Sequence, residues 1–383
     1  MNSPIHVEPV AGRRDRKRFI DFPYAFYRDD YPHWVPPLRR DVKKTLHPRK
    51  NAFFDHGDIQ LFLATDGSGA VVGRIAAIVN GMHLQKYEDG TGFFGFFECV
   101  NDYAVAEVLF DAAHSWLREQ GLHAMRGPAN PSLNDTAGLL VEGFDEPPSI
   151  LMPYNPPYHE DFLLRYGFER IMTMWAFYAH KKYAKTDRLR RGVDIIKHRN
   201  PGLKLRTIDM DRFQEEADAI LDIYNDAWSD NWGHVPMTDA EFEQLASDLK
   251  QIVDPNIVFI LEIDEEPIAF SIALPNLNQV LQHVPDGRLF PLGLPKLLLH
   301  TQLGTIYETR MPLMGVRSDY QGRGFDSWLI LATMDNAPSY GYDACEVSWI
   351  LDTNKPLLNA IDKIGATKDK QYAMFECVLS ANA

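Results

Sequence analysis

One stretch near the C-terminal end constrains the fold of this chain more than any other. The apolar run from Met311 to Val316 is typical of a strand, and apolar residues recur at helical spacing from Trp328 to Met334. Between these two segments lie Gly322 and Gly324. Glycines at a strand-to-helix turn let backbone N–H groups approach an anion, which the helix N-terminus also attracts. The sequence therefore predicts a strand, a phosphate-binding turn and a helix in direct succession.

The segments after this turn follow a regular order. Residues 344–350 are predicted to form a strand, 354–361 a helix that stops at Gly365, and 371–378 a final strand. A chain of 383 residues is long for one domain and comfortable for two. Two stretches, 59–79 and 257–274, each have the pattern of a hairpin, which suggests that the chain contains two similar halves.

The pattern resembles motif A of the GNAT superfamily of N-acyltransferases, whose Gln/Arg-x-x-Gly-x-Gly/Ala signature falls here on Gln321, Gly324 and Asp326. The resemblance implies an α/β fold of two tandem GNAT-like lobes, each a twisted mixed sheet flanked by helices. It also implies an acyl-coenzyme A, or another acyl-phosphopantetheine, as co-substrate rather than a permanently bound cofactor. The residues that the resemblance assigns to this donor are Val316, Gln321, Gly322, Arg323, Gly324, Phe325, Asp326 and Asn354.

Asp326 departs from the signature, which has a small residue at that position. A carboxylate about 4 Å from a phosphate is repelled by about 4 kcal/mol at an effective dielectric constant near 20. The same carboxylate gains only about 0.3–1 kcal/mol from the helix N-terminus. Either Asp326 points away from the pyrophosphate, or the donor carries fewer phosphates there, as the pantetheine of an acyl carrier protein does.

We expect an N-terminal lobe at 1–182, a basic interlobe segment at 183–205 and a C-terminal lobe at 206–383. The N-terminal lobe has no glycine turn, because residues 99–104 place an acid and bulky side chains where a pyrophosphate needs bare backbone. We therefore expect this lobe to shape the acceptor site. Two of its loops carry polar side chains that either form ordinary turns or contact the substrate. The candidate substrate-binding residues are Asn130, Asn134, Asp135, Tyr154 and Asn155.

Charge and composition exclude several classes of function. A net charge of −14 argues against general nucleic-acid binding and against a tRNA donor. The 13 histidines and 3 cysteines show no metal-ligand spacing, so no metal site is predicted. The sequence has neither a signal-peptide pattern nor a run of about 20 apolar residues. We expect a cytoplasmic protein, with contact at the inner membrane face as an alternative.

Two further segments stand out from this background. Lysines and arginines crowd residues 181–199, which form either a solvated helix or a landing site for an anionic carrier or lipid headgroup. Leucines crowd residues 285–304 between predicted strands. That set either docks on the N-terminal lobe, lines an acyl chain, or touches a membrane.

Longer stretches resemble a two-lobed bacterial family of GNAT-like proteins that includes bacterial ceramide synthase. The resemblance lies in residues 34–37, 92–98, 138–145, 154–158 and 322–326. It implies an N-acyltransferase that moves an acyl group from acyl-CoA or acyl carrier protein to an amine, with a long-chain lipid amine as one acceptor. The competing reading is a catalytically inactive GNAT pair that serves as a binding or regulatory module, which Asp326 favours.

Transfer to an amine needs a base, because alkyl amines are mostly protonated at neutral pH. Glu98, in an otherwise aromatic strand, is the first candidate, and Glu346, on the strand that would line the thioester, is the second. For each of them the more ordinary explanation is a strand residue that faces solvent. The resemblance also implies that Tyr372 protonates the departing thiolate and that the N–H of Val316 or its neighbour holds the oxyanion.

Overall fold

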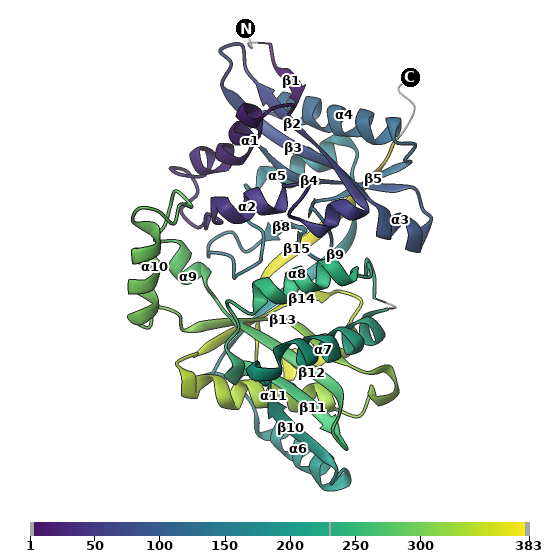
Figure 1. Ribbon diagram of the computed structural model, residues 1–383, viewed down its shortest axis with the longest axis vertical. Helices are drawn as coiled ribbons and strands as arrows, with labels where there is room; N and C mark the ends of the chain where they lie inside the picture. Colours follow the sequence, from purple (N-terminus) through teal and green to yellow (C-terminus); the bar gives the residue numbers. More distant parts are fainter. Residues whose placement is uncertain (1–3, 230, 380–383) are drawn as a thin grey trace. The chain divides into compact units, whose positions relative to one another are not determined.

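The computed structural model describes residues 4–229 and 231–379. Residue contacts divide the chain into two units (Figure 1). Unit 1 consists of Met1–Thr173, Leu281–Leu298 and Gln371–Ala383, and unit 2 of Met174–Val280 and Leu299–Lys370. Each unit consists of separate stretches of the chain, so the units do not test the predicted ranges 1–182, 183–205 and 206–383, which stay a prediction. The outermost residues of these ranges, 1–3 and 380–383, lie outside the described residues.

Unit 1 is built on a mixed sheet with the strand order β1-β2-β3-β4-β5-β15, in which β8 also pairs with β15. Its strands are β1 His6–Pro9, β2 Gly57–Thr65, β3 Val71–Asn80, β4 Thr91–Cys99, β5 Ala124–Gly127, the short pair β6 Ala129–Asn130 and β7 Thr136–Ala137, β8 Leu139–Glu142, and part of β15 Thr367–Val378. Its helices are α1 Arg13–Phe26, α2 Arg39–Thr45, α3 Gly81–Tyr87, α4 Tyr103–Glu119 and α5 Tyr158–Tyr166.

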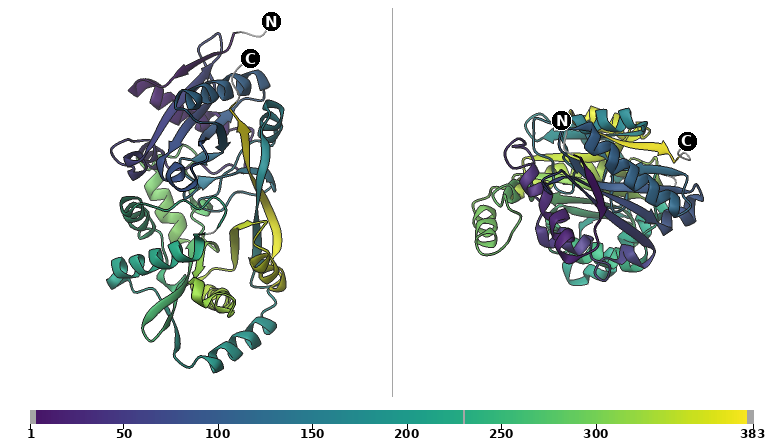
Figure 2. Two further views of the ribbon diagram at one scale, coloured as in Figure 1. Left: turned by 90° about the vertical axis from the view of Figure 1, so that its right-hand side faces the viewer. Right: turned by 90° about the horizontal axis from the view of Figure 1, so that it is seen from above.

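The predicted hairpin of unit 1 is confirmed, since β2 and β3 pair antiparallel along their length. Its turn is set locally by Asp66, whose carboxylate accepts hydrogen bonds from the amides of Ser68 at 2.8 Å and Ala70 at 3.1 Å. Helix α4 then covers the sheet with the fully buried side chains of Leu109, Phe110 and Leu117. Figure 2 shows the yellow end of β15 running beside α4, and Phe375 and Cys377 of β15 belong to the same apolar core.

The sheet strands of unit 2 follow the order β9-β14-β13-β12-β11-β10. Its strands are part of β9 Glu169–His180, β10 Leu203–Thr207, β11 Val258–Ile263, β12 Glu266–Pro275, β13 Glu308–Val316 and β14 Ala344–Leu351. Its helices are α6 Asp187–Arg199, α7 Phe213–Trp228, α8 Asp239–Leu249, α11 Phe325–Asn336 and α12 Lys355–Lys363. Two more helices, α9 Asn278–Leu281 and α10 Gly293–Gln302, lie where the chain passes between the units.

Helices cover both faces of the unit 2 sheet, and successive side chains of β11 pack alternately against the helices of one face and of the other. Phe259 and Leu261 pack with Leu329 of α11 in one apolar core. Val258 instead lies with residues of α7 and α8 on the other side. The chain enters α8 through a capping box, in which Thr238 and Glu241 satisfy each other's backbone N–H groups. Short 3-10 helices complete the chain at η1 Ala52–Asp55, η2 Met210–Arg212, η3 Pro255–Ile257, η4 Ser318–Tyr320 and η5 Ala337–Tyr340.

The two units repeat one pairing pattern, which agrees with the predicted similarity of the two halves. In unit 1, β2 with β3 and β3 with β4 are antiparallel and β4 with β5 is parallel. In unit 2, β11 with β12 and β12 with β13 are antiparallel and β13 with β14 is parallel. The helix that leads into the parallel strand is α4 in the first case and α11 in the second.

The last strand of each sheet comes from the other half of the sequence. β5 of unit 1 pairs antiparallel with the C-terminal strand β15, from Ala124 with Val378 to Gly127 with Phe375. β14 of unit 2 pairs antiparallel with β9, which follows the elements of unit 1 along the chain. Residues Gln371 to Val378, which sequence order assigns to the C-terminal lobe, therefore complete the sheet of unit 1.

Candidate active site

The glycine turn after β13 is open to a ligand in the way that the sequence predicts. Gly322 and Gly324 have φ angles of 71° and 84°, in the left-handed region that favours glycine. Gly324 is the N-cap of α11, and no side chain accepts a hydrogen bond from the first turn of that helix. Within the described residues, the amides of residues 322–327 have no hydrogen-bond acceptor. A row of free N–H groups at a helix N-terminus is suited to a phosphate.

Other side chains fix this turn rather than fill it. The Asp226 carboxylate of α7 accepts hydrogen bonds from the Ser318 amide at 2.5 Å and from the Ser318 hydroxyl at 3.0 Å. The side-chain amide of Gln321 donates to the carbonyl of Val316 at 3.2 Å, and the Arg323 guanidinium donates to the carbonyl of Asp319 at 2.7 Å. The predicted donor-binding side chains Gln321 and Arg323 thus shape the turn themselves.

The last two predicted donor-binding residues of the turn have different surroundings. Phe325 is 1% exposed and packs in the core beneath α11. Asp326 lies half-buried in the first turn of the helix. Asn354, predicted from the resemblance, caps α12 by accepting a hydrogen bond from the Leu357 amide at 3.2 Å.

The parallel strands β13 and β14 pair over only part of their length. Paired residues run from Glu308 with Ala344 to Met311 with Val347. Beyond that point β13 continues to Val316 and β14 to Leu351 without pairing to each other. The two strands therefore separate on the side of the glycine turn, which leaves backbone groups between them for an extended ligand.

A buried polar cluster lies where the strands separate. Arg310 of β13 and Glu346 and Ser348 of β14 are 4%, 3% and 2% exposed. The Ser348 hydroxyl donates to the Glu346 carboxylate at 2.5 Å and accepts from the Arg310 Nε at 2.9 Å. Arg310 Nε also lies 4.0 Å from Glu346 Oε1. The charges of Arg310 and Glu346 compensate each other, as buried charges must.

A tyrosine lies next to this cluster on the neighbouring strand. Tyr178 of β9 is paired in register with Glu346. Its hydroxyl donates to the Glu308 carboxylate at 2.8 Å. Burial, together with this hydrogen bond, raises the pKa of Tyr178 well above its usual value. Unit 2 thus places a tyrosine hydroxyl, two carboxylates and an arginine along three adjacent strands.

The corresponding turn of unit 1 is closed, in line with the expectation that only one lobe binds the donor. Its helix α4 begins at Asp102, whose side chain accepts a hydrogen bond from the Ala104 amide at 3.0 Å. An aspartate cap occupies one of the helix amides and adds negative charge where a phosphate needs positive potential.

Glu98, the first candidate base, forms an ion pair in unit 1. Its carboxylate lies 2.5 Å from the Nε of Arg74, a residue that is 5% exposed. Arg74 also donates to the carbonyl of Phe19 at 2.8 Å. The pair compensates a buried charge, which is a structural task. Glu98 and the glycine turn belong to different units.

The candidate substrate-binding residues of unit 1 divide into two groups. The Asn130 side chain accepts from the Phe96 amide at 2.6 Å, and Asn155 bonds both the amide and the carbonyl of Leu140, at 2.7 and 3.1 Å. These two side chains brace the backbone. Asn134, Asp135 and Tyr154 lie at least partly exposed, and burial raises the pKa of Tyr154.

Tyr372 belongs to unit 1 through the exchanged strand. It is fully buried and pairs in register with Leu140 of β8. In a single GNAT lobe, the order of the strands along the chain would place Tyr372 beside the strand that lines the thioester. Here that strand, β14, has β9 as its antiparallel neighbour instead. The protonation role of Tyr372 stays a prediction.

The basic segment packs beside the glycine turn. Ile196 of α6 lies so close to Gly324 that a Cβ there would come within 2.8 Å of the Ile196 side chain. Lys197 Nζ lies 5.0 Å from the centre of the Trp328 ring, and Arg190 forms an ion pair with Asp335 at the other end of α11. Helix α6 therefore runs antiparallel to α11 and brings its basic C-terminal turn to the turn of predicted phosphate contacts.

Arg310, Ser348, Tyr178 and Asp226 were not among the predicted site residues. Arg310 directly precedes the apolar run from Met311 to Val316 and follows Glu308 and Thr309, so it does not stand out as a charge within an apolar stretch. Asp226 and Tyr178 carry no signal either, because only the fold brings them beside the turn and β14. Within residues 4–229 and 231–379, no three or more histidine, cysteine or acidic side chains are grouped closely enough to hold a metal ion.

The sequence relatives decide the family. No protein-family model matches the chain. Bacterial ceramide synthase of Caulobacter vibrioides (strain NA1000 / CB15N) is 38% identical over 387 residues, which cover 99% of this chain and 98% of that protein. Protein YghO of Escherichia coli (strain K12) is 35% identical over 375 residues, 97% of this chain and 94% of that protein. The chain belongs to the bacterial ceramide synthase family.

Solved structures agree on the fold of this family member. A tandem GNAT protein from the clavulanic acid biosynthesis pathway aligns over 99% of this chain and 100% of its own, with a TM-score of 0.57 and 12% identity. The glucosamine N-acetyltransferase region of a fungal multi-domain β-N-acetylglucosaminidase aligns over 98% of this chain and 38% of its own, with a TM-score of 0.60 and 16% identity. The predicted fold class and family resemblance are confirmed, and the chain is a GNAT-fold acyltransferase homologue.

Proposed function

We propose that this protein transfers an acyl group from an acyl thioester to the amine of a long-chain lipid, as the name of its 38% identical relative suggests. The observation that carries the proposal is the arrangement within unit 2: a turn with free amides, a pair of separating strands and a buried carboxylate on one of them. The amides of the turn would hold the phosphates of the donor, and the thioester would lie between β13 and β14.

The reaction joins the amine nitrogen to the thioester carbon and breaks the carbon–sulfur bond. A base takes one proton from the amine nitrogen, and the departing thiolate takes up a proton to leave as a free thiol. Backbone N–H groups near Val316 would stabilise the oxyanion that forms in between. We propose Glu346 as the base, ahead of Glu98, because Glu346 lies in unit 2 on β14, one residue before the last pair that this strand forms with β13.

The charges on α6 bear on which carrier, coenzyme A or a carrier protein, holds the acyl group of the donor. Its basic residues Arg188, Arg191, Lys197 and Arg199 are exposed, and Lys197 lies over Trp328 of α11. The exposed charges of Lys197 and Arg199, in the last turn of α6 beside the glycine turn, favour a donor that carries negative charge outside the pyrophosphate. An acidic carrier protein meets this description, and so does the adenosine end of acyl-CoA.

The leucine-rich segment supports contact with a membrane, where a lipid acceptor resides. Large apolar side chains around α10 are strongly exposed, with Phe290 at 73%, Leu292 at 66% and Leu303 at 69%. Exposed apolar surface of this density is typical of an interaction site. Among the helices of residues 4–229 and 231–379, none has both the length and the apolar character needed to cross a bilayer. We propose a peripheral protein at the cytoplasmic face of the membrane.

The proposal is tested by giving the purified protein hexadecanoyl-CoA and a long-chain amino alcohol, and measuring free thiol and amide product together. Glu346→Gln should lower kcat by about two orders of magnitude, within the range for loss of a general base. Glu262→Gln is the matched control, because Glu262 is also a buried strand glutamate paired with an arginine, Arg206 at 2.8 Å. Equal turnover in the two variants would reject Glu346, and no thiol release with any amine would favour the inactive binding module.

A further inference from the structure

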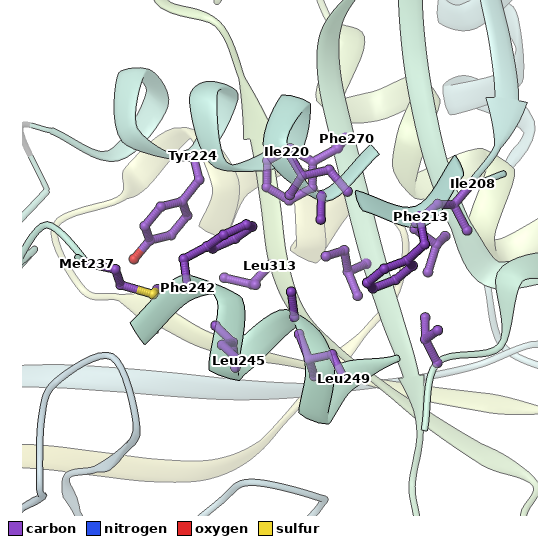
Figure 3. A pocket seen from close by; sticks show the side chains of 15 residues that line it. Ile208, Phe213, Ile220, Tyr224, Met237, Phe242, Leu245, Leu249, Phe270 and Leu313 are labelled. Carbon is purple, nitrogen blue, oxygen red and sulfur yellow. The ribbon is translucent and has the colours of Figure 1, made fainter. Parts of the chain in front are cut away.

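Unit 2 contains an apolar pocket that the chemistry described so far does not use. It lies between the sheet and the two helices α7 and α8 (Figure 3). Its lining residues come from α7, α8, the loops beside them and the strands β11 to β13. They are Ile208, Phe213, Ala217, Ile220, Tyr224, Met237, Phe242, Leu245, Ala246, Leu249, Val253, Val258, Phe270, Ile272 and Leu313.

The shape of the pocket selects its ligand. Figure 3 shows the labelled side chains in a row, from Tyr224 and Met237 at one end to Phe213 and Ile208 at the other. The pocket is open on one side, and its volume of about 60 Å³ is well below the roughly 150 Å³ of an engineered cavity that binds benzene. A ring therefore does not fit, and the pocket receives only a short length of an unbranched hydrocarbon chain. Phe242 and Leu245 are only half-buried, so the row has an open side along which a longer chain can continue.

The lining offers a ligand almost nothing but hydrocarbon. It contains no charged residue, and the hydroxyl of Tyr224 is the only side-chain polar group among its members. Transfer of a methylene group from water to such a site is favourable, whereas a polar group without a partner is penalised. The pocket therefore discriminates for a chain without substituents.

The pocket adjoins the opening between β13 and β14. Leu313, in the middle of the row, lies two residues beyond Met311, the last residue of β13 that pairs with β14. A second link runs through α7, where the Tyr224 ring contacts the Trp228 ring at 5.0 Å between centres. The Trp228 indole N–H donates to the carbonyl of Met314 at 3.2 Å, in the unpaired part of β13.

We infer that this pocket is the subsite for the acyl chain of the donor, and that it takes unbranched chains longer than acetyl. The inference rests on the proposed function, because that function places the thioester between the same two strands. The chain then leaves the thioester at Leu313 and follows the row beneath α8, while the amine acceptor approaches from elsewhere.

The test narrows the pocket and leaves the turn untouched. Ala246 is buried in the lining, so Ala246→Leu projects a larger side chain into the pocket. Ala240→Leu makes the same change at an exposed position of the same helix and is the matched control. Phe242→Ala widens the pocket at a half-buried position. Melting temperatures of all three variants report whether they remain folded.

Two readouts separate this inference from the proposed function. The first is kcat/KM for acetyl-, octanoyl- and hexadecanoyl-CoA with one amine. Ala246→Leu should lower the value for hexadecanoyl-CoA at least tenfold and that for acetyl-CoA less than twofold, while Phe242→Ala should shift preference toward longer chains. The second is binding of cis-parinaric acid, an unbranched fluorescent fatty acid, which needs no acyl transfer. Its affinity should fall about tenfold in Ala246→Leu and stay unchanged in Ala240→Leu.

The outcomes assign each failure to one idea. Probe binding that responds to Ala246→Leu, without transfer from any thioester, supports the pocket and rejects the proposed function. Transfer whose chain-length preference is the same in Ala246→Leu, Phe242→Ala and the unaltered protein rejects the pocket and leaves the function. A change in preference for the chain of the amine instead of that of the thioester also overturns the inference, because the acceptor would then occupy the pocket. If Ala246→Leu does not fold, the preference of Phe242→Ala decides alone.

Discussion

Replacement of Gly324 by alanine tests the turn on which the donor site depends. Gly324 has a φ of 84°, and its new Cβ would lie 2.8 Å from the end of the Ile196 side chain. The left-handed conformation costs an alanine about 1–2 kcal/mol. The contact with Ile196 adds little, because the far end of a flexible side chain can move. For a unit of roughly 150–250 residues, this loss lowers the melting temperature by about 2–8 °C.

The strain must be separated from the effect on the ligand, and the chain offers a matched control. Gly341 has a φ of 91° with open space at its Cβ position, and it lies just before β14, away from the turn. Gly341→Ala should therefore lose similar stability. Only Gly324→Ala should also disturb the amides at the start of α11, because the backbone relieves its strain at that turn.

The assay is calorimetric titration of folded protein with acetyl-CoA. We expect Gly324→Ala to bind at least tenfold more weakly, which corresponds to about 1.4 kcal/mol, and Gly341→Ala to bind as the unaltered protein does. Equal affinities in the two variants, with equal losses of stability, would refute the reasoning. The turn would then be an ordinary helix cap.

The remaining predictions concern charge, acid and apolar surface. Burial lowers the pKa of His159 to about 3. As pH falls from about 6.5 toward 3, the unfolded chain binds a proton at this residue and the folded chain does not, so the free energy of unfolding decreases. At pH 5 the decrease is about 2 kcal/mol, and His159→Phe should remove it when urea unfolding is compared at pH 7 and pH 5. An unchanged pH dependence of unfolding in the variant would contradict this assignment. Glu98→Gln leaves Arg74 without its counter-charge and should destabilise unit 1 by about 3 kcal/mol, whereas a hundredfold drop in turnover at unchanged stability would make Glu98 the base. Lys197→Glu should raise KM for the donor several-fold without a change in kcat, and comparison of acyl-CoA with acyl carrier protein shows which of them α6 recognises. Leu298 and Leu299 are both more than half exposed, so replacing both by serine should weaken binding to anionic lipid vesicles at least tenfold, measured by sedimentation, and leave the melting temperature unchanged. A loss of stability without loss of vesicle binding would place this surface inside the protein instead.

The sequence alone determined the local elements and the turn. The turn could be predicted because glycine adopts the positive φ found at 322 and 324 without the strain that other residues meet there. The hairpins followed from the alternation of apolar residues and from turn residues such as Asp66, which bonds its own neighbours. These features depend on contacts within a few residues, so the sequence carries them directly.

Tertiary structure decided which distant residues share a site. The exchange of β9 and β15 puts Tyr178, and not Tyr372, beside Glu346, although sequence order suggests the opposite. Glu98 looked like an isolated acid until the antiparallel register of β3 and β4 placed Arg74 against it. Pairing between strands far apart in sequence depends on the register and sheet order of the whole fold, and no local pattern records either. The apolar pocket between α7, α8 and Leu313 arose in the same way, from side chains that each look like ordinary core residues in the sequence.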